Sequence, residues 1–364
     1  MGKFEVGSDK LNVMKIMDKY NNMAVPSVQV MIEGKDIANK SFMAVNNVSV
    51  ETSTEKADIC TFEVLNAYDV EKLEFAWVDK DFTPGKKVEI KFGYVDILTT
   101  VFEGFITAVT CAIRSDETIV HVTCMDKSFA MMKCQKSRIW TEKKHSDIVG
   151  DISGSYGLSS KVSATQLDYA SISQNDLSDY KFINLLADYN GFEFFVTGST
   201  LYFRDRSKDL SSAILLTVGT DVASFEYTID IGEQIAAIDV KGYGLEKKLI
   251  KGKATSVTKL GNQMDGVSII KKLIGENSVK ELNGSFFSDK DAEIFAKGQL
   301  QKQSQKFVRA KAEVIGIPEL RAGRFISIKG MWATKEKLFY IKNCQHTMDE
   351  EGYSTRLDLE GNSI

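Results

Sequence analysis

The sequence predicts a mainly β protein with α+β inserts, organised around two related antiparallel β-barrel modules. Two observations predict this fold. Short runs of alternating apolar and polar residues, bounded by glycine and aspartate turns, fill residues 82–128 and again residues 318–364. The two stretches also agree in spacing, because Ile106 to Val122 and Ile341 to Leu357 both span 16 positions. Equal spacing across a hairpin favours two copies of one small module over two unrelated meanders.

Direct matches between the two stretches support the repeat. Allowing a one-residue slip, residues 84–90 match 321–328 in outline, 105–106 match 340–341, and 122–124 match 357–359. Asp, Glu, Glu and Gly at positions 349–352 form a polar turn that joins the last two runs. Both stretches are therefore expected to be antiparallel meanders.

The first elements are an arm and a barrel. Val13, Ile16, Met17 and Tyr20 form one apolar stripe of a short helix within an N-terminal arm, residues 1–25. This stripe could pack on its own chain or on a sister subunit. Residues 26–135 then alternate in five or six short strands, which predicts the first barrel module.

Residues 136–212 change character and predict an α+β insert. A short helix is expected from His145 to Tyr156. A clearer helix follows, with Ser178 or Asp179 as its N-cap and Gly191 as its C-terminal stop. A hairpin over residues 192–203 completes the insert.

The second barrel module is expected in two pieces, residues 213–262 and 306–364. Between them, residues 263–305 predict a helical insert. Its main helix carries the apolar stripe Ala292, Phe295, Ala296 and Leu300 after Ser288, a plausible N-cap.

The composition is that of an ordinary globular protein of two or three domains. Of 364 residues, 43% are hydrophobic and 26% are charged. The net charge of -4 gives no global basic field, which argues against nucleic-acid binding and against an anionic membrane surface. No run of about 18 apolar residues predicts a membrane span. The N-terminus shows no secretory signal.

Five cysteines are present, and none forms a CxxC motif. Cys60, Cys111 and Cys124 lie in apolar, strand-like runs. An odd number of cysteines in such positions predicts reduced core thiols in a protein made in a cytoplasm.

Three stretches together resemble a known family. They are residues 175–203, with Asn175-Asp176-Leu177-Ser178 before the helix; residues 291–323, with Gly316-Ile317-Pro318; and residues 340–357, with His346. Their order and separation are similar to those of the baseplate hub proteins of contractile phage tails and injection systems, the phage late control D family. The hub part of type VI secretion spike proteins belongs to the same group. The resemblance covers most of residues 26–364.

The resemblance implies an architecture and a set of partners. Such hubs carry two tube-like β-barrels per chain and form homotrimers, so that three chains present six modules. A trimer of this kind adapts a six-fold tail tube, or its tube initiator protein, to a three-fold central spike and forms part of the conduit. Other baseplate proteins would be further partners. Expected locations are the tail baseplate of a virion or injection particle, after assembly in the bacterial cytoplasm.

Because the chain ends at Ile364, directly after the closing strand, we expect the trimeric spike protein to be a separate polypeptide. The sequence does not distinguish between three kinds of particle: an infecting phage, a headless bacteriocin and an injection system.

No catalytic, cofactor-binding or metal-binding residue is predicted. His121 is expected in a strand, His145 in a charged loop and His346 at a strand end, and none has a ligand-spaced partner. Nucleophile-elbow and phosphate-loop motifs are absent from the sequence. The acidic residues at 349–351 are interpreted as a solvated turn. Phe192, Phe194 and Phe195 are interpreted as core residues and not as a stacking platform.

Two alternatives to a structural hub remain. One is a β-barrel module that binds glycans on a cell surface, which would need exposed aromatic residues interleaved with basic ones. The other is a tail-tip cell-wall hydrolase, which would need a carboxyl group with a raised pKa in a cleft. The structural, non-enzymatic interpretation is the one we expect.

Overall fold

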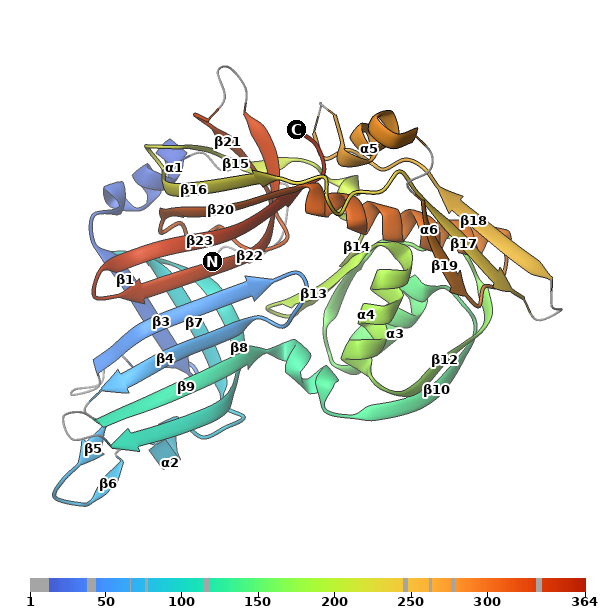
Figure 1. Cartoon of the computed structure of the whole chain (residues 1–364). Coiled ribbons are helices and arrows are strands. Elements are labelled where there is room, and N and C mark those ends of the chain that lie inside the picture. Colours follow the sequence, from blue (N-terminus) through green and yellow to red (C-terminus); the bar gives the residue numbers. More distant parts are fainter. Residues whose placement is uncertain are drawn as a thin grey trace.

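The computed structural model describes residues 13–37, 44–65, 67–75, 78–113, 118–244, 248–261, 264–275, 279–331 and 336–364. One large sheet takes strands from both ends of the chain and covers most of the core, while two inserts lie beside it (Figure 1). The strand order is β16-β20-β23-β22-β3-β4-β9-β8-β7-β1-β2, and β21 with β15 branches from β22. The prediction of a mainly β protein with antiparallel sheets is confirmed.

The first module supplies seven strands of the large sheet. Alternation explains them: along β4, Cys60, Phe62 and Val64 are fully buried, whereas the residues between them are half-buried. These strands are β1 (Pro26–Ile32), β2 (Lys35–Asp36), β3 (Ala44–Ser53), β4 (Ile59–Leu65), β7 (Lys87–Tyr94), β8 (Ile97–Ile113) and β9 (Thr118–Asp126). A small hairpin, β5 (Tyr68–Asp69) and β6 (Glu74–Phe75), projects from this module (Figure 1), and the short helix α2 (Val78–Asp81) follows it and packs on the core through Val78.

The second module supplies six strands. They are β15 (Ser212–Thr217), β16 (Val222–Ile229), β20 (Val308–Ile315), β21 (Phe325–Lys329), β22 (Lys337–Asp349) and β23 (Gly352–Gly361). A two-residue turn, Glu350-Glu351, joins β22 to β23 because Asp349 pairs with Gly352. The two modules have equivalent strand orders. Neighbouring strands follow the order β1-β7-β8-β9-β4-β3 in the first module and β15-β21-β22-β23-β20-β16 in the second.

The pairing of the two long hairpins is the same residue by residue. Ile106 pairs with Cys124, and one residue is then bulged out before Ala108 pairs with Thr123. Ile341 pairs with Leu359, and one residue is again bulged out before Asn343 pairs with Asp358. β8 residues therefore correspond to β22 residues 235 positions later.

Two glycines open the equivalent strands in the same way. Gly85 and Gly323 have φ of +94° and +89°, a conformation that disfavours any side chain. Each donates its backbone N–H to the carbonyl of the matching isoleucine, Ile106 at 2.8 Å and Ile341 at 2.9 Å. The outline match between residues 84–90 and 321–328 therefore describes equivalent turns.

β3 of the first module pairs antiparallel with β22 of the second, from Asn343 opposite Ser53 to Met348 opposite Val48. This contact, called the β3–β22 joint below, makes the two modules one continuous sheet. Val50 and His346 face each other there and are almost fully buried. Most of the buried apolar residues of both modules form a single core.

The first insert has the predicted elements. Ser178 caps its main helix through a hydrogen bond from the Lys181 N–H, and Gly191 ends the helix with φ of 67°. Around it lie β10 (Gln135–Lys143), α3 (His145–Ser155), β11 (Ser159–Val162), β12 (Tyr169–Ser178), α4 (Asp179–Asn190), β13 (Glu193–Thr197) and β14 (Thr200–Arg204). Phe194 and Phe195 are buried and Phe192 is half-buried, as expected of core residues.

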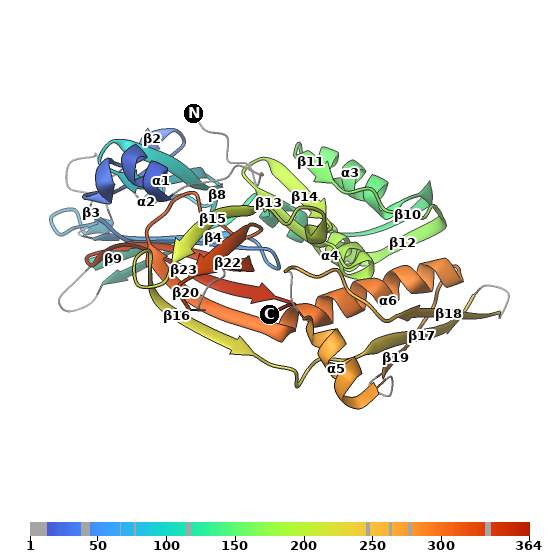
Figure 2. The same ribbon diagram turned by 90° about the horizontal axis from the view of Figure 1, so that it is seen from above.

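The predicted span 213–262 of the second module is wrong beyond Ile229. Residues 237–254 leave the large sheet and build a separate three-stranded sheet that packs on α6 (Figure 2). Its strands are β17 (Ala237–Tyr243), β18 (Leu249–Ala254) and β19 (Val279–Gly284); the helices are α5 (Gly266–Ile274) and α6 (Asp289–Ser304). Alternation predicts that a segment is a strand, but it does not say which sheet the strand joins.

The arm helix α1 (Val13–Lys19) packs on its own chain. Ile16 is 4% exposed and the adjoining Tyr20 is fully buried in the large core. Tyr20 also donates a hydrogen bond to Glu319 at 2.8 Å. Of the two open possibilities, packing on the own chain is confirmed for these residues.

Candidate functional site

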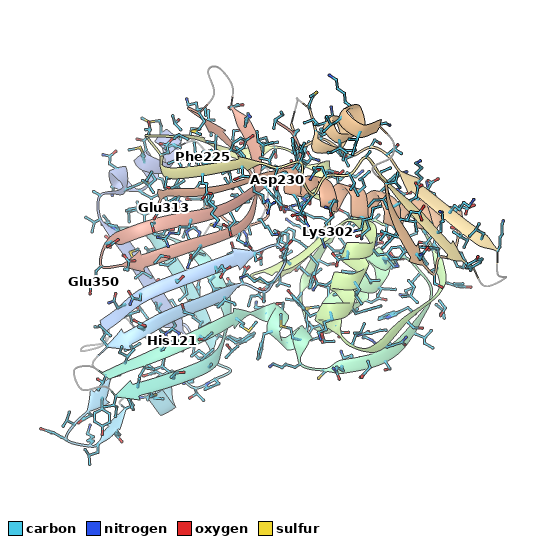
Figure 3. All side chains as sticks on the ribbon, in the orientation of Figure 1. His121, Phe225, Asp230, Lys302, Glu313 and Glu350 are labelled. Atoms are coloured by element: carbon cyan, nitrogen blue, oxygen red, sulfur yellow. The ribbon has the colours of Figure 1, made fainter. Side chains whose placement is uncertain are left out.

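The candidate site is the broad polar face of the large sheet, opposite the core. On β23, Leu357 and Leu359 point into the core, whereas Arg356 and Asp358 point away from it. β20 repeats the pattern, with Ala310 and Ala312 inside and the charged residues Arg309 and Lys311 outside. Because the β3–β22 joint continues the sheet, this polar face extends over both modules (Figure 3).

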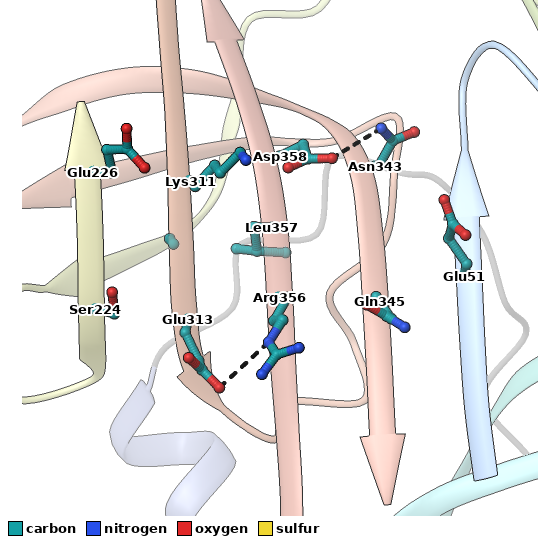
Figure 4. A pocket seen from close by; sticks show the side chains of 11 residues that line it. Glu51, Ser224, Glu226, Lys311, Glu313, Asn343, Gln345, Arg356, Leu357 and Asp358 are labelled. Carbon is teal, nitrogen blue, oxygen red and sulfur yellow. Dashed lines mark hydrogen bonds and ion pairs between the residues drawn. The ribbon is translucent and has the colours of Figure 1, made fainter. Parts of the chain in front are cut away.

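A shallow hollow lies in the polar face across β16, β20, β23, β22 and β3 (Figure 4). Arg356 approaches Glu313 at 3.5 Å, and Asn343 donates to Asp358 at 3.1 Å. The side chains are mostly exposed, so these contacts compete with water and add little stability. The polar residues around the hollow are Glu51, Ser224, Glu226, Lys311, Glu313, Asn343, Gln345, Arg356 and Asp358.

Charges of both signs balance on this surface. The hollow holds four carboxylates and two cations, and the neighbouring hollow adds Lys306, Arg309, Lys342, Glu233 and Glu360. Neither an anionic polymer nor an acidic protein is strongly attracted or repelled by such a mixture. The geometry fits a wall that faces an aqueous space.

Beneath the joint, a buried ion pair ties the two modules together. Arg321 Nη2 lies 3.3 Å from Asp58 Oδ2, and the two residues are 2% and 5% exposed. Asp58 also accepts the Ser53 N–H at 2.9 Å, and Asp126 accepts the Asp58 N–H at 2.7 Å. Burial raises the pKa of Asp58, and the guanidinium opposes that rise. Sequence reasoning missed this pair because 263 positions separate its members.

His346 anchors the same region from β22. Its Nε2 lies 2.8 Å from the Leu320 carbonyl oxygen, and its Nδ1 lies within hydrogen-bond distance of Thr355 and Tyr353. Burial lowers the pKa of His346 to about 4. With its ring nitrogens engaged by the core, this residue is structural.

His145 does not lie in a charged loop, as the sequence suggested. It begins α3, is 5% exposed, and stacks on Tyr169 with ring centroids 4.4 Å apart. Burial lowers its pKa to about 4. The basic residues around it in sequence concealed its burial. His121 lies on β9 as expected, with Glu63 3.7 Å away.

The prediction of core thiols is wrong for one of the three strand cysteines. Cys60 and Cys124 are fully buried, whereas Cys111 is exposed near the end of β8. The periodicity placed Cys111 correctly on the core face of its strand. The side chain is nevertheless exposed, as is that of Ile113 two residues further along the same face of β8.

Within the described ranges, no group of three or more His, Cys, Asp or Glu residues could hold a metal ion. Nor is any helix there long and apolar enough to cross a membrane.

Solved structures share this fold. The 43 kDa tail protein of prophage MuSo2 from Shewanella oneidensis is 12% identical, with a TM-score of 0.70 over 92% of this chain and 98% of its own. A tail protein from Neisseria meningitidis is 11% identical, with a TM-score of 0.68 over 92% and 96% of the two chains.

A third structure is the c3393 protein of E. coli, described as a type VI secretion component similar to the T4 tail proteins gp27 and gp5. It is 12% identical, with a TM-score of 0.56 over 92% of this chain and 77% of its own. At such low identities the likeness shows the fold, which is a β-rich fold shared with phage tail proteins.

The family described as the Alg8 N-terminal domain matches residues 22–350. The chain belongs to this family. A comparison with curated proteins finds no match.

Proposed function

We propose that this chain is a structural baseplate hub of a contractile tail or injection particle, of the late control D type. Three copies form a ring of six modules, which adapts a six-fold tail tube to a three-fold spike. The proposal is supported most by one observation: two modules with the same strand pairing are joined edge to edge in one continuous sheet. Such a joint can repeat around a closed ring.

The polar face fits the wall of the central conduit in this ring. Its balanced, solvated charges would neither trap nor repel a passing polymer. The chain's own residues would act mechanically, through buried joints such as Arg321–Asp58, and without chemistry.

Related folds are consistent with these partners. Several solved chains with this fold come from complexes whose descriptions pair VgrG with PdpA, two of them from Francisella, at TM-scores of 0.52 to 0.55 and 10–11% identity. By analogy, a trimeric spike protein, a tube or tube initiator protein and other baseplate proteins would bind this hub. We place it in the baseplate, after assembly in the bacterial cytoplasm.

Light scattering of the purified chain at several concentrations tests the proposal. The chain is 40.6 kDa. A trimer is therefore expected at three times that mass, about 122 kDa, either alone or after the spike or tube protein is added. A chain that remained a monomer with both partners would contradict the proposal.

A further inference from the structure

The large sheet has two edges at which the strand pairing stops. β7 pairs with β8 only as far as Phe105, and from Ala108 to Ile113 the described partner of β8 is β9 alone. At the other end, β16 is the last strand of the main path of the sheet, next to β20 (Figure 1). Strand edges of this kind are templates for pairing with another chain.

Each of these edges has an equivalent inside the chain that is covered. β8 corresponds to β22, whose residues 343–348 pair with β3. β3 and β16 also correspond, because each is the neighbour of an equivalent strand: Val50 of β3 pairs with Cys60 on β4, and Tyr227 of β16 pairs with Ala310 on β20. β4 and β20 hold the same place beside β9 and β23. The β3–β22 joint is thus a template for a contact between β16 and β8.

Exposure supports this correspondence. In the covered joint, Thr52 is 1% exposed, but its counterpart on β16, Ile229, is 46% exposed. Ile113, at the end of β8, is 58% exposed. Apolar side chains on the core face of two end strands are expected to be buried by a further strand. Figure 3 shows Phe225 on β16 and Asp230 just beyond its end.

We propose that β16 of one copy pairs antiparallel with β8 of the next copy, in the register of the β3–β22 joint. This inference rests on the proposed ring and adds its subunit contact. In the joint, Gln345 is opposite Glu51. Its counterpart between copies places Thr110 of one chain opposite Thr228 of the next. In the same register, Ala108 of one chain lies opposite Asp230 of the next, as Asn343 lies opposite Ser53 in the joint.

The side chains brought together are compatible. On the polar face, Thr110 meets Thr228, a pair that favours antiparallel sheets. Ala112 meets Glu226, so no two like charges are placed opposite each other. On the core face, Val109 meets Ile229 and Ile113 meets Phe225, which would bury the exposed apolar groups. The polar face would then continue without interruption from one copy to the next.

Cross-linking between copies tests the register. In a background with Cys111→Ala and Cys134→Ala, which removes both exposed thiols, Thr110→Cys is combined with Thr228→Cys. Residues directly opposite have Cα atoms about 4.5–5.5 Å apart, within reach of a disulfide. The matched control combines Thr110→Cys with Ser224→Cys. Ser224 is exposed on the same face of β16 but lies about 13 Å further along the strand.

After mild oxidation, non-reducing gels and light scattering are read together. We expect covalent dimers and trimers from the 110/228 variant and at least tenfold less from the 110/224 control. A trimer by mass with no cross-link at 110/228, or with equal cross-linking in both variants, would overturn the register but leave the proposed hub standing. A monomer with neither cross-link, in the presence of spike and tube proteins, would overturn both.

Discussion

The two β modules of this chain have the same strand pairing, but they differ in what pairs with the far end of their longest strands, β8 in the first module and β22 in the second. In the second module, β3 covers the end of β22, and Val50 and His346 are almost fully buried there. In the first module, the equivalent end of β8 keeps Ile113 58% exposed. Of these two equivalent strand edges, the edge of β22 is therefore paired within the chain, whereas the edge of β8 is left open to a second chain. The covered joint should therefore control the stability of the monomer, and the open edges should control assembly.

The largest effect is expected from breaking the buried ion pair at the covered joint. Arg321→Met leaves the Asp58 carboxylate buried without its partner, which should lower the free energy of unfolding by about 3–5 kcal/mol. Urea unfolding followed by circular dichroism measures the loss. An unfolding free energy within about 0.5 kcal/mol of wild type would refute the assigned role.

A second prediction concerns acid. The pKa of His346 is about 4 in the fold and about 6.5 when unfolded, so the unfolded chain binds more protons between these values. The stabilisation is complete above pH 6.5 and is lost as pH falls towards 4, by about 3 kcal/mol.

Unfolding of wild type and His346→Gln at pH 7 and pH 4.5 measures this contribution. The difference between the two proteins in their change of unfolding free energy removes the opposing effect of Asp58, because both proteins contain this residue and burial raises its pKa in both. We expect the variant to lose less stability than wild type over this interval. Equal losses would show that His346 is not buried in its neutral form.

The open edge should respond in the opposite way. Ile229→Lys places a charge on the core face of β16, where the side chain is 46% exposed in the single chain. Unfolding of the monomer should change by less than about 0.5 kcal/mol, while association should weaken at least tenfold, about 1.4 kcal/mol. Sedimentation equilibrium measures the second quantity. Unchanged association would argue against β16 as a subunit contact.

The smallest effect is expected on the polar face. Arg356→Gln removes a cation whose side chain is 66% exposed and lies 3.5 Å from Glu313. Exposed pairs of this kind contribute about 0–1 kcal/mol, so unfolding and assembly should both stay close to wild type. This variant also serves as the matched control for Arg321→Met. A large loss of stability would mean that the face is packed and not solvated.

Much of the fold could be predicted from local patterns. The equal spacing around Ile106 and Ile341 predicts the two equivalent hairpins, because a strand repeats every two residues and a hairpin fixes its register. The helix caps at Ser178 and Ser288 were also predictable, because each cap is a local contact between the serine side chain and the backbone N–H three residues later.

What could not be predicted depends on partners distant in the chain. Residues 237–254 have the alternation of barrel strands, yet their sheet is decided by β19 and α6, which come later. The polar face follows from alternation, but its hollow depends on β3 and β16 being brought into one sheet by the joint. Arg321 carries no local signal, because only the closed fold brings Asp58 to it.

Electron microscopy of the assembled chain tests the central claim most directly. The account predicts a closed ring of three copies with six similar sheet segments, in which Arg356 and Asp358 face the central channel and β16 adjoins β8 of the next copy. A ring with this polar face on its outside, or an assembly without three-fold symmetry, would contradict the account.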